Sequence, residues 1–262
     1  MTTIGVFDSG VGGLSVLRHI RALLPDARLI YVADSAHVPY GDKPHHYIEQ
    51  RAVELTRFLI EQGAEAIVIA CNTATAAAAT TLRQHFKCPI IGMEPAVKPA
   101  VSATKSGVAG ILATIGTLKS ARFAALLESH AKGIEIVTQG CPGLVEQVES
   151  GDLEGQKTRE LVERYTKPLL SQGADTLILG CTHYPFLAPM IRSVAGPDIA
   201  LIDTGEAVAK QLQRRLLAEL PDARPGDGTE HFFTSGDPHA ASLIISKLWG
   251  SPVVVHPIKY TV

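Results

Sequence analysis

Short runs of apolar, β-branched residues alternate along the chain with longer stretches in which apolar residues recur at helical spacing. Residues 66–70 (Ala-Ile-Val-Ile-Ala) form one such run, and an uninterrupted apolar run is typical of a strand buried on both faces of a parallel sheet. Ile48, Ala52, Leu55 and Leu59 carry the apolar stripe of an amphipathic helix. This alternation predicts an α/β protein with parallel sheets.

The same reading assigns the remaining elements. Strands are predicted at residues 4–7, 29–33, 66–70, 89–91, 108–113, 134–138, 176–179, 199–202, 231–234 and 253–255. Helices are predicted at residues 14–24, 48–59, 74–86, 118–130, 156–170, 206–220 and 239–249.

The chain contains an internal repeat. Residues 63–73 (Gly-Ala-Glu-Ala-Ile-Val-Ile-Ala-Cys-Asn-Thr) resemble residues 173–183 (Gly-Ala-Asp-Thr-Leu-Ile-Leu-Gly-Cys-Thr-His), with Cys71 aligned on Cys181. Repetition of a strand and its helix start indicates two related units. We therefore predict two similar parallel-sheet α/β domains related by a pseudo-two-fold axis. Their cleft would bring the two strand-end cysteines to opposite sides of one pocket.

Composition narrows the classes of function. Of the 262 residues, 46% are hydrophobic and 19% are charged, which indicates a globular chain. The 24 basic and 26 acidic side chains leave a formal charge of −2, so we expect neither nucleic-acid binding nor binding to a membrane surface. No apolar run is long enough to span a membrane and no signal peptide is recognisable, which favours a cytoplasmic protein.

Two of the four cysteines stand out by position. Cys71 and Cys181 each follow an apolar strand and precede a predicted helix. Oriented N–H groups at such a site lower the pKa of a thiol, so both are candidate bases or nucleophiles. A lone cysteine is better explained as a small core residue, and Cys88 and Cys141 are assigned that role. A metal site with His183 would lack the spacing of known zinc motifs.

Other polar residues are weaker candidates. Asp8 and His183 could tune a thiol or move a proton, although Asp8 could equally cap a helix. Residues 8–13 (Asp-Ser-Gly-Val-Gly-Gly) match neither the dinucleotide fingerprint nor the P-loop, which favours a tight structural turn. Glu149 is predicted from its pattern alone to be an exposed helix residue.

Taken together, the motifs resemble those of bacterial glutamate racemases. The resemblance runs from residue 4 to about residue 215 and rests on residues 4–14, 31–34, 39–41, 70–74 and 180–185. It implies a cofactor-independent isomerase that interconverts L- and D-glutamate, the latter a building block of peptidoglycan. It implies no metal, and no lysine near the cysteine motifs is placed for pyridoxal phosphate.

The resemblance also implies roles for individual residues. The Cys71 thiol would take the α-proton of D-glutamate, and the Cys181 thiol that of L-glutamate. Asp8, His183 and Glu149 would assist the thiols. The implied substrate-binding residues are Asp8, Ser9, Tyr40, Gly41, Asn72, Thr73, Thr114, Thr182 and His183, with Thr117 as a further contact. Because the motif residues are neutral donors at helix starts, we expect them, rather than arginine, to hold the substrate carboxylates.

The resemblance further implies a discontinuous first domain (residues 1–97 plus 208–262), an inserted second domain (98–207) and a homodimer. The first strand begins at residue 4, without the extension that some activator-dependent members carry, so we expect basal activity without an activator. Two alternatives stay open. One is a racemase for aspartate or another acidic amino acid, and the other is a two-lobed protein that binds small carboxylates and has structural cysteines.

Overall fold

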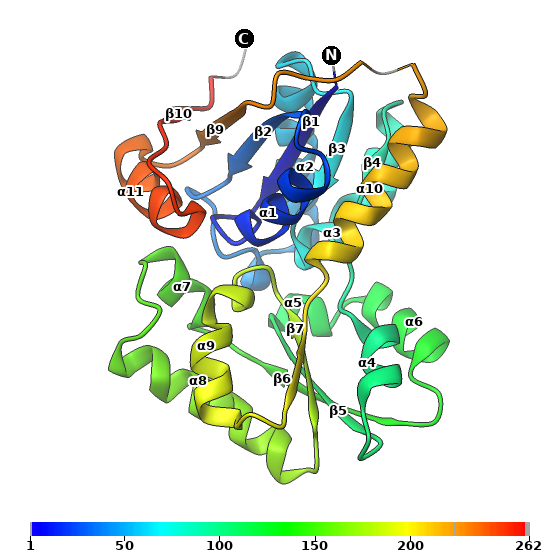
Figure 1. The fold of residues 1–262 in the computed structure, drawn as a ribbon, viewed down its shortest axis with the longest axis vertical. Helices are drawn as coiled ribbons and strands as arrows, with labels where there is room; N and C mark the ends of the chain where they lie inside the picture. Colours follow the sequence, from blue (N-terminus) through cyan, green and yellow to red (C-terminus); the bar gives the residue numbers. More distant parts are fainter. Residues whose placement is uncertain (1, 223, 260–262) are drawn as a thin grey trace.

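The computed structural model describes residues 2–222 and 224–259 and has two lobes, each built around a parallel sheet (Figure 1). The first sheet contains β1 (Thr3–Asp8), β2 (Arg28–Ala33), β3 (Ala66–Ile69), β4 (Ile90–Ile91), β9 (Glu230–Thr234) and β10 (Val255–Pro257), in the order β10-β9-β2-β1-β3-β4. The second contains β5 (Val108–Ala113), β6 (Glu135–Gly140), β7 (Thr176–Gly180) and β8 (Ala200–Ile202), in the order β6-β5-β7-β8. The order β2-β1-β3-β4 recurs as β6-β5-β7-β8, so the repeat seen in the sequence is also a structural repeat.

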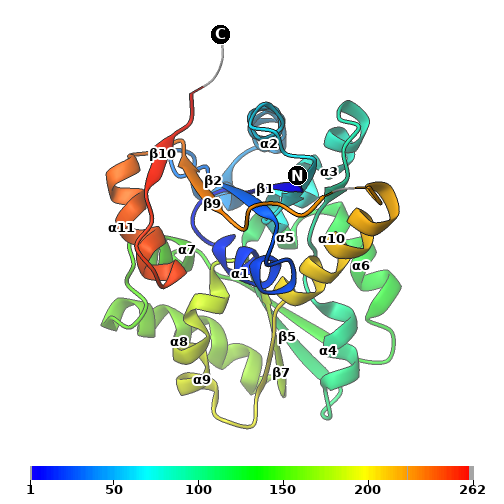
Figure 2. The same cartoon turned by 45° about the horizontal axis from the view of Figure 1, so that its top comes forward.

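Helices cover both faces of the first sheet, as the uninterrupted apolar strands predict. One face packs against α2 (His45–Glu61) and α3 (Asn72–His85) through alternate strand residues such as Phe7 and Ile69. The other face, with Val6 and Val68, packs against α1 (Leu14–Leu23), α10 (Gly205–Glu219) and α11 (Pro238–Trp249). Figure 2 shows α1 and α10 side by side on this face.

The second sheet is covered in the same way. The face carrying Leu177 and Leu179 packs against α7 (Leu144–Glu149), α8 (Gln156–Ser171) and α9 (Ala188–Ala195). The face carrying Ile111 and Ile178 packs against α4 (Val97–Ala103) and α6 (Ala121–His130). Each lobe is therefore a three-layer α/β unit with its own buried sheet.

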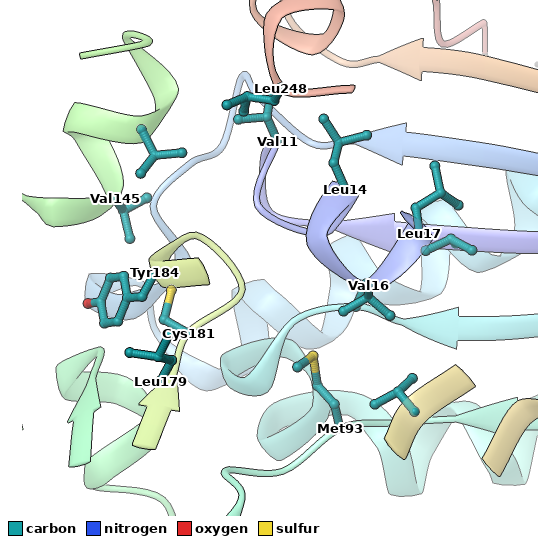
Figure 3. Close-up of a cluster of buried hydrophobic side chains, with 14 of the residues drawn as sticks. Val11, Leu14, Val16, Leu17, Met93, Val145, Leu179, Cys181, Tyr184 and Leu248 are labelled. Atoms are coloured by element: carbon teal, nitrogen blue, oxygen red, sulfur yellow. The ribbon is translucent and has the colours of Figure 1, made fainter. Parts of the chain in front are cut away.

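The two lobes share part of one apolar core. The chain passes between them from β4 into α4 and from β8 into α10 (Figure 1). Figure 3 shows one cluster that contains Leu14 and Val16 of the first lobe and Leu179 and Tyr184 of the second. Met93, which lies in the segment joining β4 to α4, belongs to the same cluster. All five are buried, so the contact between the lobes includes close-packed side chains.

The carboxyl ends of the central strands position the site. In the first sheet, β1 ends at Asp8, and β3 is followed closely by Cys71. In the second sheet, β5 is followed by Thr114 and β7 by Cys181. Because side chains at the carboxyl edge of a parallel sheet lie together, Cys71 and Cys181 place a thiol from each lobe at the end of a central strand.

Three expectations about the elements were wrong in detail. The helix predicted at 118–130 is two helices, α5 (Ile115–Leu118) and α6, because the Ser120 hydroxyl accepts a hydrogen bond from the Phe123 N–H and starts a new helix. The last strand lies two residues later than predicted, at Val255–Pro257. The short elements α4, α9, η1 (Tyr40–Asp42) and η2 (Tyr184–Leu187) were not predicted, and α7 was predicted only in so far as Glu149 was taken to be a helix residue. None of the helices in residues 2–222 and 224–259 is long and apolar enough to cross a bilayer.

Candidate active site

The two strand-end cysteines line one pocket between the lobes. Cys71 follows β3, and its sulfur accepts a hydrogen bond from the Ala74 N–H (3.4 Å) at the start of α3. Cys181 follows β7 directly. Both thiols are free and buried, and the pocket they line is nearly closed in this arrangement, with a cavity volume of about 10 Å³.

Most of the predicted binding residues line this pocket. Its lining is Ser9, Pro39, Tyr40, Gly41, Cys71, Asn72, Thr73, Thr114, Val145, Gly180, Cys181, Thr182 and His183. Among the described residues, no lysine or arginine lines it. Two predicted residues, Asp8 and Glu149, do not line it but lie behind the residues that do. Apart from the thiols and His183, the lining combines neutral polar side chains with two glycines and the apolar side chains of Pro39 and Val145.

Cys181 belongs to a chain of three side chains. Its sulfur lies 3.7 Å from Nδ1 of His183, and Nε2 of that ring lies 2.6 Å from Oε1 of Glu149. The same carboxylate oxygen accepts the N–H of Val11 (2.7 Å) in the first lobe. Burial lowers the pKa of His183, but the contacts with Cys181 and Glu149 outweigh it and hold the pKa well above its ordinary value. The ring is therefore held as an imidazolium.

The glycine turn after β1 makes room for this chain of side chains. A Cβ atom at Gly10 would lie 1.9 Å from Oε1 of Glu149, and one at Gly12 would lie 2.3 Å from Nδ1 of His183. The expectation that Glu149 is an exposed helix residue was wrong, because it ends α7 facing the first lobe and its side chain is only 15% exposed. Helix periodicity cannot show that the next lobe covers a position.

Asp8 sits fully buried beneath the pocket. Its carboxylate accepts hydrogen bonds from the backbone N–H groups of Ser9 and Gly13 (both 2.6 Å) and from the Thr182 hydroxyl (3.3 Å). Burial raises the pKa of Asp8, His183 lowers it and Glu149 raises it, with a net rise. Asp8 therefore organises the turn and touches the second lobe, while the N-cap position of α1, Gly13, has no side-chain cap.

The expectation of a lowered thiol pKa was wrong for Cys71. Burial raises the pKa of the Cys71 thiol and the nearby Asp8 raises it further, so that the hydrogen bond from Ala74 is outweighed. In this closed arrangement Cys71 is held as a thiol, and it lies 3.9 Å from the Ser9 hydroxyl.

Asn72 has hydrogen-bonding capacity to spare. Both polar atoms of its side-chain amide are buried without a hydrogen-bond partner, although Asn72 lines the pocket. An unpaired buried amide is costly, so both polar atoms of Asn72 are free to bind a polar group in the pocket.

Hydroxyl groups connect the lobes on one side of the pocket. The Thr73 hydroxyl of the first lobe lies 2.9 Å from the Thr114 hydroxyl and 3.1 Å from the Thr117 hydroxyl of the second. Tyr40 is oriented differently from the other polar lining residues, since its hydroxyl donates to Asp34 (2.5 Å). Thr73 and Thr114 thus present hydroxyls at the pocket, whereas the Tyr40 hydroxyl is already engaged.

The remaining cysteines lie outside the pocket. Cys141 is buried and its thiol donates to the Gln139 carbonyl (3.3 Å), and Cys88 is partly buried. Among the described residues, no group of three or more His, Cys, Asp or Glu side chains is placed to hold a metal ion.

Several lining residues escaped the sequence reasoning. Pro39, Val145 and Gly180 line the pocket but carry no group that could mark them as functional. Pro39 and Gly180 lie within the motifs that carry the resemblance, although neither was named as a binding residue. Val145 is an apolar residue of α7, and nothing in the sequence marked it as part of a pocket.

This fold and site define a class: a two-lobed α/β protein in which a thiol from each lobe lines a shared, buried polar pocket. The sequence matches the model of the family described as Asp/Glu/Hydantoin racemase over residues 4–212. The chain belongs to this racemase family, and a racemase is an isomerase.

Its similarity to individual relatives is extensive. The chain is 58% identical to a glutamate racemase of Methylococcus capsulatus over 256 residues, which cover 97% of this chain and 94% of the relative. It is 32% identical to Escherichia coli glutamate racemase in complex with L-glutamate and the activator UDP-MurNAc-Ala, with a TM-score of 0.90 over 100% of this chain and 99% of that one. It is 28% identical to Francisella tularensis glutamate racemase in complex with D-glutamate, with a TM-score of 0.84 over 99% and 97% of the two chains.

Proposed function

We propose that this protein interconverts L- and D-glutamate without a cofactor, by proton transfer between the substrate α-carbon and two thiols. The observation that carries the proposal is the placement of Cys71 and Cys181 at equivalent strand ends of the two lobes, lining one pocket. The near full-length relatives named glutamate racemase support glutamate as the substrate.

Inversion at carbon is easier with two bases than with one. A single base returns the proton mostly to the face from which it came, so removal on one face and delivery on the other favours a group on each side. Effective transfer requires the reacting atoms to be held at about 3–3.5 Å. Two thiols contributed by opposite lobes meet this need when the lobes close on a substrate.

In the proposed starting form of the enzyme, Cys181 is a thiolate and Cys71 is a thiol. The His183 imidazolium, 3.7 Å from Cys181, stabilises a thiolate there, while burial and Asp8 keep Cys71 a thiol. The Cys181 thiolate takes the α-proton of L-glutamate, and the Cys71 thiol gives its proton to the opposite face. One C–H bond breaks, one forms, and Cys71 ends as the thiolate from which the reverse reaction starts.

The pocket lining supports recognition of an acidic amino acid by neutral groups. Ser9, Asn72, Thr73 and Thr182 place hydroxyl and amide groups on its wall, and Cys71, next to Asn72, starts α3, whose N–H groups favour an anion. We assign the substrate carboxylates to these donors, with Gly41 and Thr114 completing the wall.

The wider context follows from the product. D-glutamate is a building block of peptidoglycan, so we propose that a cytoplasmic enzyme supplies it to cell-wall synthesis. We also propose a homodimer, and a division into a first domain of residues 1–97 plus 208–262 and an inserted second domain of residues 98–207. Light scattering of the purified protein tests the dimer, and assays with and without UDP-MurNAc-Ala test whether an activator changes the rate.

The central experiment is circular dichroism of the purified protein with L-glutamate, D-glutamate or L-aspartate and no added cofactor. We expect both glutamate enantiomers to be converted to the racemate and aspartate to react far more slowly. Equal turnover of aspartate would overturn the substrate assignment, and binding without turnover would indicate a carboxylate-binding protein.

Variants test the two thiols. Cys71→Ala and Cys181→Ala should each abolish inversion, while Cys88→Ala, outside the pocket, should leave it unchanged. In D₂O, the Cys71→Ala variant should still exchange the α-proton of L-glutamate through Cys181. Racemisation by either variant at a near wild-type rate would refute the two-thiol mechanism.

A further inference from the structure

One wall of the pocket is a short loop held from behind. Pro39, Tyr40 and Gly41 line the pocket, and Tyr40 is 1% exposed. The loop also meets the second lobe, since a Cβ atom at Gly116 would lie 2.8 Å from the Gly41 carbonyl oxygen. The position of this loop therefore affects both the shape of the pocket and the fit between the lobes.

The Tyr40 hydroxyl is directed away from the pocket. It donates a hydrogen bond of 2.5 Å to Oδ2 of Asp34, the residue that follows β2. Burial raises the pKa of Tyr40 and the Asp34 carboxylate raises it further, so the hydroxyl keeps its proton and remains a donor. Asp34 is fully buried, and its own N–H donates to the Asp8 carbonyl (3.0 Å).

Arg51 completes the arrangement from helix α2. Its Nε lies 3.0 Å from Oδ2 and its Nη2 lies 2.8 Å from Oδ1 of Asp34, a two-pronged contact. The arginine is itself 8% exposed and also pairs with Glu54. Neither Asp34 nor Arg51 lines the pocket.

A buried ion pair of this kind is not explained by stability alone. Removing two charges from water is costly, and apolar side chains of similar size often stabilise a core as well or better. The two-pronged contact with Arg51 also fixes the orientation of the Asp34 carboxylate, because both carboxylate oxygens are held at once. A carboxylate held in one plane gives the Tyr40 hydroxyl one place to bind.

We propose that Asp34 and Arg51 are positioning residues that fix residues 39–41 through the Tyr40 hydroxyl and thereby set the affinity for the substrate. The inference rests on the proposed racemase function of the pocket. The wall carries no proton-transfer group, so loosening it adds an ordering cost that the bound substrate and the transition state share equally. Such a change raises KM and leaves kcat nearly unaltered.

Arg51→Lys and Tyr40→Phe, singly and together, test the inference in the full-length protein. Lysine keeps the charge but loses the two-pronged contact, and phenylalanine removes only the hydroxyl. We expect each single variant to raise KM for glutamate about tenfold, as for loss of one charge-assisted hydrogen bond, with kcat within about threefold of wild type. Arg57→Lys, at an exposed position on the same helix, should leave both constants unchanged.

The double variant separates positioning from a general structural role. If Arg51 acts through Tyr40, the double variant should have the KM of Tyr40→Phe alone, because the second change has nothing left to disturb. Effects on KM that multiply would overturn the inference, as would a lower melting temperature with KM unchanged or a fall in kcat alone. Should Arg51→Lys fail to fold, Asp34→Asn combined with Tyr40→Phe provides the same comparison. A wild-type protein that does not racemise glutamate would instead refute the proposed function.

Discussion

Replacing Glu149 by glutamine tests the electrostatics of the site with almost no change in side-chain volume. Oε1 of Glu149 accepts hydrogen bonds from Nε2 of His183 (2.6 Å) and from the N–H of Val11 (2.7 Å). The glutamine oxygen can still accept both, but the negative charge that stabilises the imidazolium is lost. A hydrogen bond to a charged group contributes about 1.5–3 kcal/mol, so a loss of about 2 kcal/mol is reasonable for this mostly buried pair.

That energy corresponds to a fall in kcat/KM of about 30-fold, at about 1.4 kcal/mol per factor of ten. The fall should be equal in the two directions, because L- and D-glutamate have equal free energies in water and the ratio of the two kcat/KM values must stay at one. Circular dichroism started from each enantiomer measures both values. Equal values of kcat/KM in the two directions show that the assay is sound. The size of the decrease in kcat/KM tests whether the Glu149 charge stabilises the imidazolium.

The pH dependence gives a second readout. Burial lowers the pKa of His183, but the contacts with Cys181 and Glu149 raise it above its ordinary value, so the imidazolium and the activity that needs it are lost as pH rises through that pKa. Removing the charge at Glu149 lowers the pKa, and the alkaline limb of the profile should move to lower pH. Glu146→Gln, an exposed position on the same helix, is the control. A Glu149→Gln variant with kcat/KM within about twofold of wild type and an unmoved alkaline limb would refute the reasoning.

Three further changes test other parts of the molecule. Asn72→Ala should raise KM for glutamate at least about tenfold, because the side-chain amide has no hydrogen-bond partner in the protein and is available to the substrate; steady-state kinetics check this, and an unchanged KM would contradict it. Gly12→Ala should abolish most activity while the far-ultraviolet circular dichroism spectrum is retained, since the new methyl group would lie 2.3 Å from Nδ1 of His183; near wild-type kcat would show that the ring has room to move. Asp175→Asn should lower the free energy of unfolding at pH 7 by about 1 kcal/mol, discounted for solvent screening. Partial burial alone would raise the pKa of Asp175. Hydrogen bonds from Thr104 and from the N–H groups of Ser106 and Lys105 outweigh burial and lower this pKa to about 2. This stability is present above the unfolded pKa and is lost as pH falls toward 2, so the difference in denaturant midpoint between Asp175→Asn and wild type should shrink below about pH 4, and a constant difference would contradict the assignment.

The order of the helices and strands was predictable because it depends on the local hydrophobic pattern. The equivalent positions of Cys71 and Cys181 were predictable because the repeat aligns them. A strand such as β3 is apolar over its whole length since both of its faces are covered, and this leaves a mark in consecutive residues. Likewise, Cys71 and Cys181 lie at the same position of two similar eleven-residue segments, residues 63–73 and 173–183. Helix boundaries near residues 118–121 were missed because one capping hydroxyl, at Ser120, decides them.

Other features depend on contacts between residues that are far apart in the chain. Glu149 looked like a surface residue of its helix, and only the packing of the second lobe against the glycine turn after β1 brings it to His183 and Val11. The pKa of Cys71 follows the same logic: its place before a helix predicts a lower value, but burial by both lobes raises it.

The sequence by itself therefore determined the α/β class, the repeat, and the residue types that meet at the strand ends, because each is fixed by hydrophobic period or by a contiguous motif. The tertiary structure alone decided which of those groups are charged, which carboxylates back them, and that Asp34 and Arg51 hold one wall of the pocket. Charge state and hydrogen-bond partner depend on burial and on distances of a few ångströms between segments that the chain brings together only when it folds.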